Sequence, residues 1–284
     1  MAIVINSNAF SLNAQRNLTK SQGDLSTSLQ RLSSGLRINS AKDDAAGQFT
    51  VEKLTADVRG TNQAIRNAGD GISLAQTAEG ALGQISNNLQ RIRELAVQSS
   101  TDTVEDRSGL QAEVDQLTQE ISRIVANTSF NNTSLLSANN SNALITFQVG
   151  SDGLASNQIS VNLTAGTGAI SSIQGVSTDL VATGTIDIDS STDAFAALST
   201  IDDSLDSLSK KRATFGAIQN RFESAISNLS VYSENLTAAR SRIQDADFAA
   251  ETARLTRAQV LQQAGISILS QANQLPSQAL SLLG

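Results

Sequence analysis

The chain has 284 residues, of which 39% are hydrophobic and only 3% aromatic, so any core must be built from aliphatic side chains. It contains no Cys and no His, which excludes disulfides, thiolate nucleophiles, Cys-ligated metals and the usual general base near neutral pH. The net charge is −7, and residues 124–209 carry eight Asp without any Lys, Arg or Glu, the opposite of a nucleic-acid-binding surface. We therefore expect no catalytic, metal-binding or cofactor-binding residues, no cofactor and no nucleic-acid partner.

The N-terminal part of the chain has the pattern of an amphipathic helix. Its leucines recur at steps of three, four and seven residues, which places them on one helix face: Leu18, Leu25, Leu29, Leu32 and Leu36. Residues 1–6 lack the basic region and the 7–15-residue apolar stretch of a signal peptide, and no run of residues approaches the roughly 18 apolar residues of a membrane span. We expect a terminal helix, with neither a signal peptide nor membrane insertion.

A longer aliphatic series predicts a helix over residues 54–99. Steps of three, four and seven connect the aliphatic residues from Val58 to Ala96, and such a helix would be roughly 70 Å long at about 1.5 Å per residue. A third helix is expected to carry the aliphatic series from Leu110 to Ile124. Its start is predicted to be capped by Asp106 or Ser108, two residue types that cap helix N-termini.

The middle of the chain differs in kind, because residues 137–195 are rich in Ser, Thr, Asn, Gly and Asp. Within this stretch, residues 144–149 and 159–163 alternate between apolar and polar side chains, as half-buried strands do. Turn-forming residues at 150–153 separate them. A third short strand is expected at 185–188. The pattern predicts a small β element on long helices.

The C-terminal part contains an unbroken seven-residue repeat. An exact repeat of this length favours coiled-coil packing, and it runs through Ile201, Leu208, Phe215, Phe222, Leu229, Leu236 and Ile243. The intervening core positions, taken four residues later at Leu205 and Arg212, are less regularly apolar, which indicates packing on a bundle rather than a symmetric zipper. A last helix follows, and Pro276 should end or kink it.

The two ends of the chain are expected to pair with each other. Neither terminal helix can bury its stripe alone, since helical stability comes mostly from packing. No acidic residue precedes Asp24 and no charged residue follows Arg257, so the helix backs carry amides and hydroxyls that suit contact between identical chains. The alternative is that the ends are merely low in charge and disordered when free. The predicted self-assembly core is Leu18, Leu25, Leu29, Leu32, Leu36, Leu255, Leu261, Ile268, Leu269 and Leu275.

Several motifs, in the expected order, resemble bacterial flagellin. Residues 30–47 read QRLSSGLRINSAKDDAAG and residues 90–99 read QRIRELAVQS. Near the C-terminus, ARSRIQDADF at 239–248, QQAG at 262–265 and QANQ at 271–274 complete the match. The resemblance covers essentially the whole chain outside the acidic middle.

The resemblance implies a mainly α fold, a long antiparallel helical bundle or coiled coil with paired terminal helices and a small β-hairpin element. The implied inner core pairs residues 1–44 with 245–284. Residues 45–177 and 190–244 would form the long helical bundle with the β element. Residues 178–189 would be a short acidic surface connection, with no large outer domain.

The resemblance also implies a function without enzymatic activity. Members of this family polymerise into the filament of the bacterial flagellum for motility, leave the cell by type III export, and meet an export chaperone, a filament cap and hook-junction proteins. Host innate receptors are further implied partners. The resemblance implies that Toll-like receptor 5 docks at Arg91, Leu95 and Glu113. It also implies that a cytosolic sensor reads the tail residues Leu280, Leu282 and Leu283. Within the class, the alternative is the flagellin-like hook–filament junction protein. From another class, the alternative is a secreted module that binds as a monomer.

Overall fold

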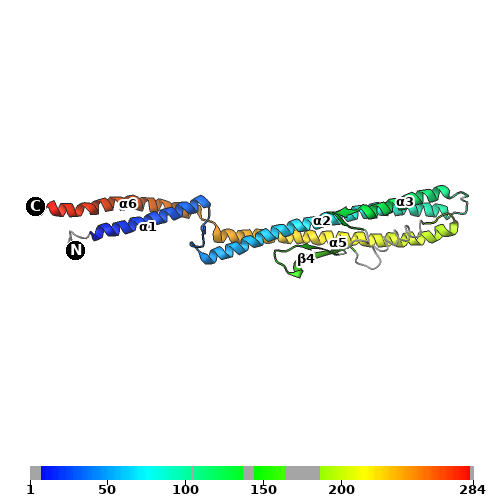
Figure 1. Ribbon diagram of the computed structural model, residues 1–284, viewed down its shortest axis with the longest axis horizontal. Helices are drawn as coiled ribbons and strands as arrows, with labels where there is room; N and C mark the ends of the chain where they lie inside the picture. The colour runs from blue at the N-terminus through cyan, green and yellow to red at the C-terminus, as the bar shows by residue number, and fades with distance from the viewer. Residues whose placement is uncertain (1–7, 104, 137–143, 164–185, 282–284) are drawn as a thin grey trace. The chain divides into compact units, whose positions relative to one another are not determined.

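The structure, a computed structural model, is mainly α-helical, which confirms the predicted fold class (Figure 1). Within its described residues, strands occur only as two short antiparallel pairs, and there is no large outer domain. The structure describes the backbone of four stretches, with side chains up to Gln274: residues 8–103, 105–136, 144–163 and 186–281.

The chain divides into two compact units. The first comprises residues 1–57 with 234–284, and the second comprises residues 58–233. The domain boundaries expected from the family resemblance, after residue 44 and before residue 245, stay a prediction.

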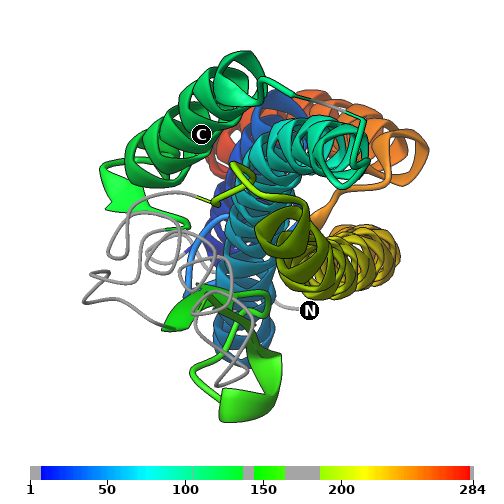
Figure 2. The same cartoon turned by 90° about the vertical axis from the view of Figure 1, so that its right-hand side faces the viewer.

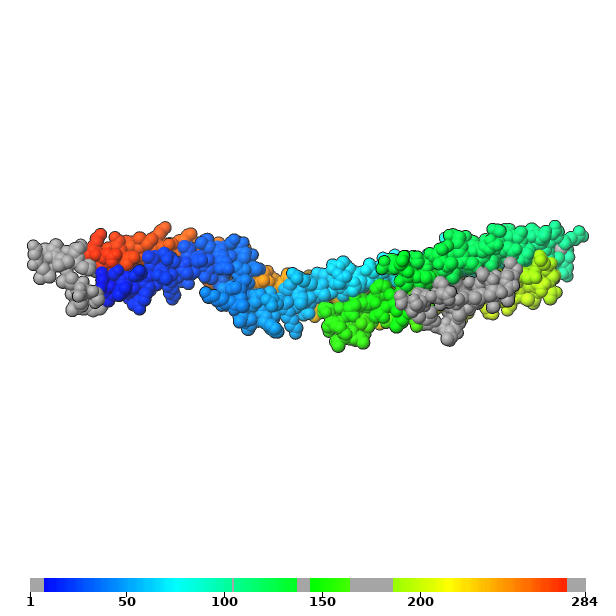
Figure 3. Space-filling view, viewed as in Figure 1, coloured from blue at the N-terminus to red at the C-terminus, as the bar shows by residue number. Residues whose placement is uncertain are grey.

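The first unit is built on two terminal helices, α1 (Ala9–Ser34) and α6 (Phe248–Ser281). They lie side by side and antiparallel, as the blue and red segments of Figure 3 show. The Asn8 side-chain amide donates to the Ala272 carbonyl at 2.7 Å, near the free ends of the two helices. Helix α6 continues past Pro276 to Ser281, so of the two outcomes predicted at this proline, an end or a kink, the end does not occur, and the kink stays a prediction.

The other end of this helix pair is closed by backbone hydrogen bonds. Gly35 ends α1 in the left-handed conformation, with a φ of 72°, and its N–H donates to the Arg31 carbonyl at 2.8 Å. The Gly35 carbonyl accepts the Ala246 N–H at 3.0 Å, and the Arg37 N–H donates to the Gln244 carbonyl at 2.6 Å. A residue with a Cβ would be strained at Gly35, because L-amino acids seldom adopt this conformation.

The second unit is organised around α2 (Ala45–Ser99), with α3 (Ser108–Asn127) and α5 (Ser191–Gln244) on different sides of it (Figure 2). The helix predicted over residues 54–99 is therefore confirmed, although α2 begins nine residues earlier. The aliphatic stripe of α2 is fully buried at Leu82, Ile85, Leu89, Ile92 and Leu95. Helix α3 begins at Ser108, whose N–H donates to the Asp106 carboxylate at 3.0 Å.

Helix α5 buries the first half of its seven-residue repeat. Ile201, Leu208, Phe215 and Phe222 are each at most 3% exposed, whereas the later members of the repeat are half-buried. The intervening core positions lie three residues after these, not four. They include Ser204 and Lys211, with 5% and 6% exposure, so the positions expected at Leu205 and Arg212 were wrong by one residue.

The two strands expected in the middle of the chain are confirmed as β3 (Leu144–Gln148) and β4 (Gln158–Asn162), which pair antiparallel. This hairpin packs on α2. The Asn67 side-chain amide donates to the Gln148 carbonyl at 3.0 Å, and a Cβ at Gly60 would lie only 3.0 Å from the Ser151 Cβ. Small or amide side chains on one face of α2 thus let the hairpin approach closely.

The strand expected at residues 185–188 is not formed in its described part, so that prediction was wrong. Residues 186–188 run extended against the side-chain amide of Gln111, which donates to the Ile186 carbonyl at 2.9 Å and accepts the Ile188 N–H at 2.8 Å. The Ser99 hydroxyl donates to the Ile188 carbonyl at 2.5 Å. One glutamine therefore satisfies the backbone groups that a neighbouring strand would otherwise pair.

A second hairpin was not foreseen. Strands β1 (Ser129–Phe130) and β2 (Thr133–Ser134) pair across Asn131 and Asn132, which have φ values of 47° and 64°. Two successive residues with positive φ are typical of a type I′ hairpin turn, which asparagine tolerates. Short as it is, the hairpin leads into the buried side chains of Leu135 and Leu136.

Candidate assembly surface

Helices α1 and α6 meet along a seam with a strict alternation of three- and four-residue steps. On α1 its members are Ser11, Ala14, Leu18, Ser21, Leu25, Ser28 and Leu32. On α6 its members are Glu251, Leu255, Ala258, Gln262, Gly265, Leu269 and Ala272. Such spacing is that of coiled-coil core positions. Most members are small or polar, and the leucines among them are half-buried.

Close approach of the two helices follows from this composition. A Cβ at Gly265 would lie 3.4 Å from the Cδ1 atom of Leu18, so these two residues face each other across the seam at van der Waals distance. The Ser11 hydroxyl donates to the Asn273 side-chain carbonyl at 2.8 Å on the other helix. The pair is therefore joined by hydrogen bonds and short side chains as well as by the leucines of the seam.

A second set of large apolar side chains on the same helices stays exposed. We call this group the exposed apolar set, and each member is between 51% and 58% exposed: Phe10, Leu12, Leu29, Phe248, Val260, Leu261, Ile266 and Ile268. Exposed apolar side chains in such number on two adjacent helices are typical of a surface that another protein covers. These residues are the best candidates for contact with further chains.

The predicted assembly leucines and isoleucine divide between the two groups. Those in the seam are Leu18, Leu25, Leu32, Leu255 and Leu269, whereas those in the exposed apolar set are Leu29, Leu261 and Ile268. Leu36 is half-buried and forms an isolated β-bridge with Asp245. The side chain of Leu275 lies outside the described residues. Five of the predicted residues thus lie in the seam, and three are more than half exposed, among them Leu261, which lines the pocket between the two helices.

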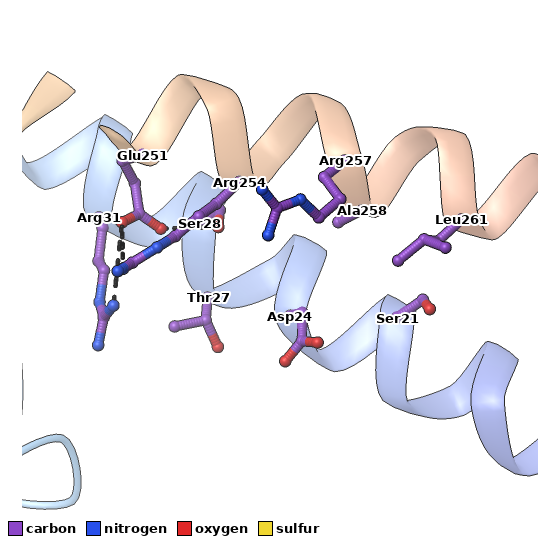
Figure 4. Close-up of a pocket in the computed structure, with 10 residues that line it drawn as sticks. All are labelled: Ser21, Asp24, Thr27, Ser28, Arg31, Glu251, Arg254, Arg257, Ala258 and Leu261. Atoms are coloured by element: carbon purple, nitrogen blue, oxygen red, sulfur yellow. Dashed lines mark hydrogen bonds and ion pairs between the residues drawn. The ribbon is translucent and has the colours of Figure 1, made fainter. Parts of the chain in front are cut away.

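A polar pocket of about 380 Å³ lies between α1 and α6 (Figure 4). At its inner wall, Glu251 is only 4% exposed and accepts hydrogen bonds from the Ser28 hydroxyl at 2.7 Å and from Arg254 Nη1 at 3.1 Å. Arg31 Nη1 lies 3.9 Å from the same carboxylate. Sequence reasoning missed this pocket, although serine and glutamate at seam positions were a visible signal.

The predicted receptor-docking residues lie in the second unit. Arg91 Nε donates to Glu113 Oε1 at 2.8 Å, and its Nη1 donates to Glu94 Oε2 at 3.0 Å. These hydrogen bonds, first that to Glu113 and then that to Glu94, raise the pKa of Arg91. The structure thus brings Arg91 and Glu113 together at the surface. Leu95 is 1% exposed and packs in the core beside them.

The remaining predicted tail residues cannot be placed. Leu282 and Leu283 lie outside the described residues, as does the side chain of Leu280. Among the described residues, no group of three or more acidic side chains is arranged to hold a metal ion. None of the described helices is both long enough and apolar enough to cross a membrane.

Comparison with known proteins agrees with the sequence motifs. The family model of the bacterial flagellin N-terminal helical region matches residues 5–141, and that of the C-terminal helical region matches residues 198–283. Flagellin of Halalkalibacterium halodurans is 44% identical over 99% of this chain and its own full length. Flagellin of Xenorhabdus nematophila is 45% identical over the full length of both chains.

A solved structure shares the fold. A putative flagellar hook-associated protein from Vibrio parahaemolyticus superposes with a TM-score of 0.56 at 16% identity, over 72% of this chain and all of that one. The two family models together match most of the chain, on either side of its acidic middle. The chain therefore belongs to the bacterial flagellins, the structural, non-enzymatic subunits that polymerise into the extracellular filament of the flagellum.

Proposed function

We propose that the exposed apolar set of α1 and α6 is buried against further copies of the chain in the core of the filament, and that the two terminal helices order as this happens. The observation that carries the proposal is that most residues in the seam between these helices are small or polar, while eight large apolar side chains of the same helices remain more than half exposed. Helices of this kind gain most of their stability from packing.

The size of the effect supports assembly through many contacts. Full burial of one large aliphatic or aromatic side chain is worth about 1.5–3 kcal/mol, so removing the remaining exposed half yields about 1 kcal/mol each. Eight such residues give about 8 kcal/mol, which is comparable to the roughly 4–15 kcal/mol that association costs in lost freedom. A single pairwise contact would be weak, so stable assembly requires several neighbours per subunit.

The test is a charge placed within the exposed apolar set. Ile268→Asp should raise the concentration needed for filament growth by tenfold or more, because a carboxylate would have to lose its water in an apolar contact. Leu154→Asp is the matched control: Leu154 is 59% exposed, but it belongs to the second unit and to neither terminal helix. Growth is measured by sedimentation and electron microscopy of purified protein.

Two results would contradict the proposal. One is normal filament growth by Ile268→Asp. The other is equal loss of growth in both variants, which would mean that any exposed apolar side chain matters equally. Circular dichroism of both variants should show an unchanged second unit, so that loss of growth is not a loss of folding.

The same surfaces suit the other partners expected of the chain. We propose that an export chaperone covers the apolar residues of α6 before secretion by the type III route, and that cap and hook-junction proteins contact the terminal helices at the two ends of a filament. An assay of chaperone binding to Ile268→Asp and to Leu154→Asp tests the first part. Equal binding by both variants would argue against it.

For host innate recognition, we propose that Toll-like receptor 5 contacts the pair formed by Arg91 and Glu113, with Leu95 supporting it from beneath. Glu113→Gln should weaken receptor signalling, because it removes the charge held at 2.8 Å from Arg91. Glu120→Gln on the same helix, whose partner is Arg123, serves as the control. Equal signalling by both variants would refute this. The tail at residues 280–283 is proposed as the segment read by cytosolic sensors.

The alternative within the class, a hook–filament junction protein, differs in amount rather than in surface. A filament subunit grows long polymers from purified protein, whereas a junction protein forms only short assemblies. Identity of 44–45% to flagellins over their full length favours the filament subunit. Electron microscopy of the concentrated protein distinguishes them.

A further inference from the structure

The paired terminal helices carry an unequal set of charges. Within α1 and α6 the basic residues are Arg16, Lys20, Arg31, Arg254 and Arg257, and the acidic residues are Asp24 and Glu251. Glu251 is buried between the helices, so Asp24 is the one acidic side chain that α1 and α6 present to solvent. When pairs of this composition meet in an assembly, their positive charges repel each other unless an acid is placed among them.

The pocket between the helices offers a place for such an acid. Asp24 and Arg257 both line it, yet among the described residues neither has a partner of opposite charge within 4.0 Å. Figure 4 shows the Asp24 carboxylate pointing away from α6, while the Arg257 guanidinium extends along α6 toward Arg254. The Arg254 side chain extends toward Glu251, so Arg254 and Arg257 line the pocket one after the other along α6, and the Asp24 carboxylate faces neither of them.

Arg254 and Arg31 both have hydrogen-bond donors that are not used within the described part of their own chain. Arg254 donates to Glu251, but its side chain is 60% exposed and keeps further donors free for another acceptor. Arg31, which lies deeper, has a buried Nε atom without an acceptor in the described part of the chain. The pocket is therefore richer in donors than its own acids can satisfy, and it suits one additional carboxylate.

We propose that Asp24 of one copy enters the pocket of a second copy and lies between Arg254 and Arg257, forming an ionic contact between subunits. The proposal rests on the assembly of the terminal helices proposed above, and it names one polar contact within it. Carboxylates paired with arginine form charge-assisted hydrogen bonds that fix geometry as well as adding attraction. The contact is therefore suited to set the register of the apolar surfaces around it.

The test exchanges the two charges between chains. Asp24→Arg and Arg257→Asp are each expected to raise the critical concentration of assembly about tenfold, which corresponds to about 1.4 kcal/mol at 25 °C. An equimolar mixture of the two single variants should assemble almost as the unmodified chain does, since each supplies the charge that the other lacks. Lys20→Asp and Glu52→Arg, which change exposed charges of the first unit outside the pocket, are the matched controls.

The outcomes separate this contact from assembly in general. If both single variants assemble normally while Ile268→Asp does not, the ionic contact is refuted and the apolar assembly surface stands. If only the double variant Asp24→Arg/Arg257→Asp recovers and the mixture does not, the two residues pair within one chain, which also overturns the proposal. If the unmodified chain itself fails to assemble, the proposed function fails.

Discussion

The glycine at position 71 gives a sharp test of how the second unit is packed. Gly71 of α2 faces Phe222 of α5, and a Cβ built there would lie 2.7 Å from the ring carbon Cε2. Phe222 is completely buried, and the ring of Phe147 meets it edge-on with centroids 5.4 Å apart. The ring therefore has little room to withdraw, and Gly71→Ala should destabilise the unit.

The magnitude follows from two opposing terms. Replacing a glycine inside a helix with alanine stabilises it by about 1 kcal/mol, whereas overpacking a filled core costs about 1–3 kcal/mol. Gly69→Ala isolates the first term, because a Cβ at Gly69 meets nothing within 4 Å. The difference between the two variants is the overpacking cost alone, about 2 kcal/mol, or about 4–8 °C in Tm for a unit of this size.

The assay is thermal unfolding followed by circular dichroism, at concentrations below those that allow assembly. We expect Gly69→Ala to melt above the unmodified chain and Gly71→Ala to melt below it. Adding Phe222→Leu to Gly71→Ala should recover part of the loss, because the smaller side chain vacates the contested space. If Gly71→Ala melts as high as Gly69→Ala, the reasoning about this contact is wrong.

Three further predictions concern single hydrogen bonds and one backbone conformation. Gln111→Leu should lower stability by about 1–3 kcal/mol and speed amide hydrogen exchange at Ile188, since buried backbone groups lose their partners; unchanged exchange would contradict this. The hydrogen bond from Arg93 lowers the pKa of Asp202. The ion pair therefore stabilises the fold at pH values above the ordinary carboxyl pKa, and this contribution is lost as the pH falls through the lowered pKa. An NMR titration should show the Asp202 midpoint rising in Arg93→Gln, and an unmoved midpoint would count against the pair. Gly35→Ala should cost about 1–2 kcal/mol by strain at positive φ, measured by unfolding, and a neutral result would mean that the turn relaxes.

The long helices were predictable because their apolar periodicity is local and continuous. Periodicity did not decide which of two adjacent faces of α5 is buried beside the seven-residue repeat. Steps of three and four from Ile201 are equally regular, and packing in the second unit decides for Ser204 over Leu205. Ser204 is the more buried of the two, although Leu205 also packs against the core at partial burial, so hydrophobicity alone did not predict their order.

The wrong prediction of a strand at residues 185–188 has a different cause. Residues 186–188 alternate as a strand does, but their backbone partners come from Gln111, which lies about 75 residues earlier in the chain. No local pattern encodes a pairing between one side chain and a distant backbone. The same holds for β1 and β2, whose strands of two residues are too short to produce a recognisable alternation.

The sequence predicted the assembly residues together, but it did not separate those in the seam from those in the exposed apolar set. Leu25 and Leu32 are seven residues apart and lie in the seam, whereas Leu29, four residues after Leu25, is 51% exposed. A leucine stripe wide enough for two partners looks the same in sequence as one wide enough for a single partner. The pocket at Glu251 needed the placement of α6 against α1, which sequence pattern does not supply.

Among the residues that the structure describes, backbone hydrogen bonds join the two halves of the terminal helix pair at one end, next to Gly35. Near Gly35, the segment after α1 forms backbone hydrogen bonds with the segment before α6. The opposite end of the pair depends on side-chain contacts such as that of Asn8 with Ala272. A helix pair of this kind unfolds first at the end that lacks these backbone hydrogen bonds. Mechanical force or a protease should therefore unfold its helical turns in order from Asn8 toward Gly35. The turns next to the anchor are then the last to be lost, whichever agent begins the unravelling.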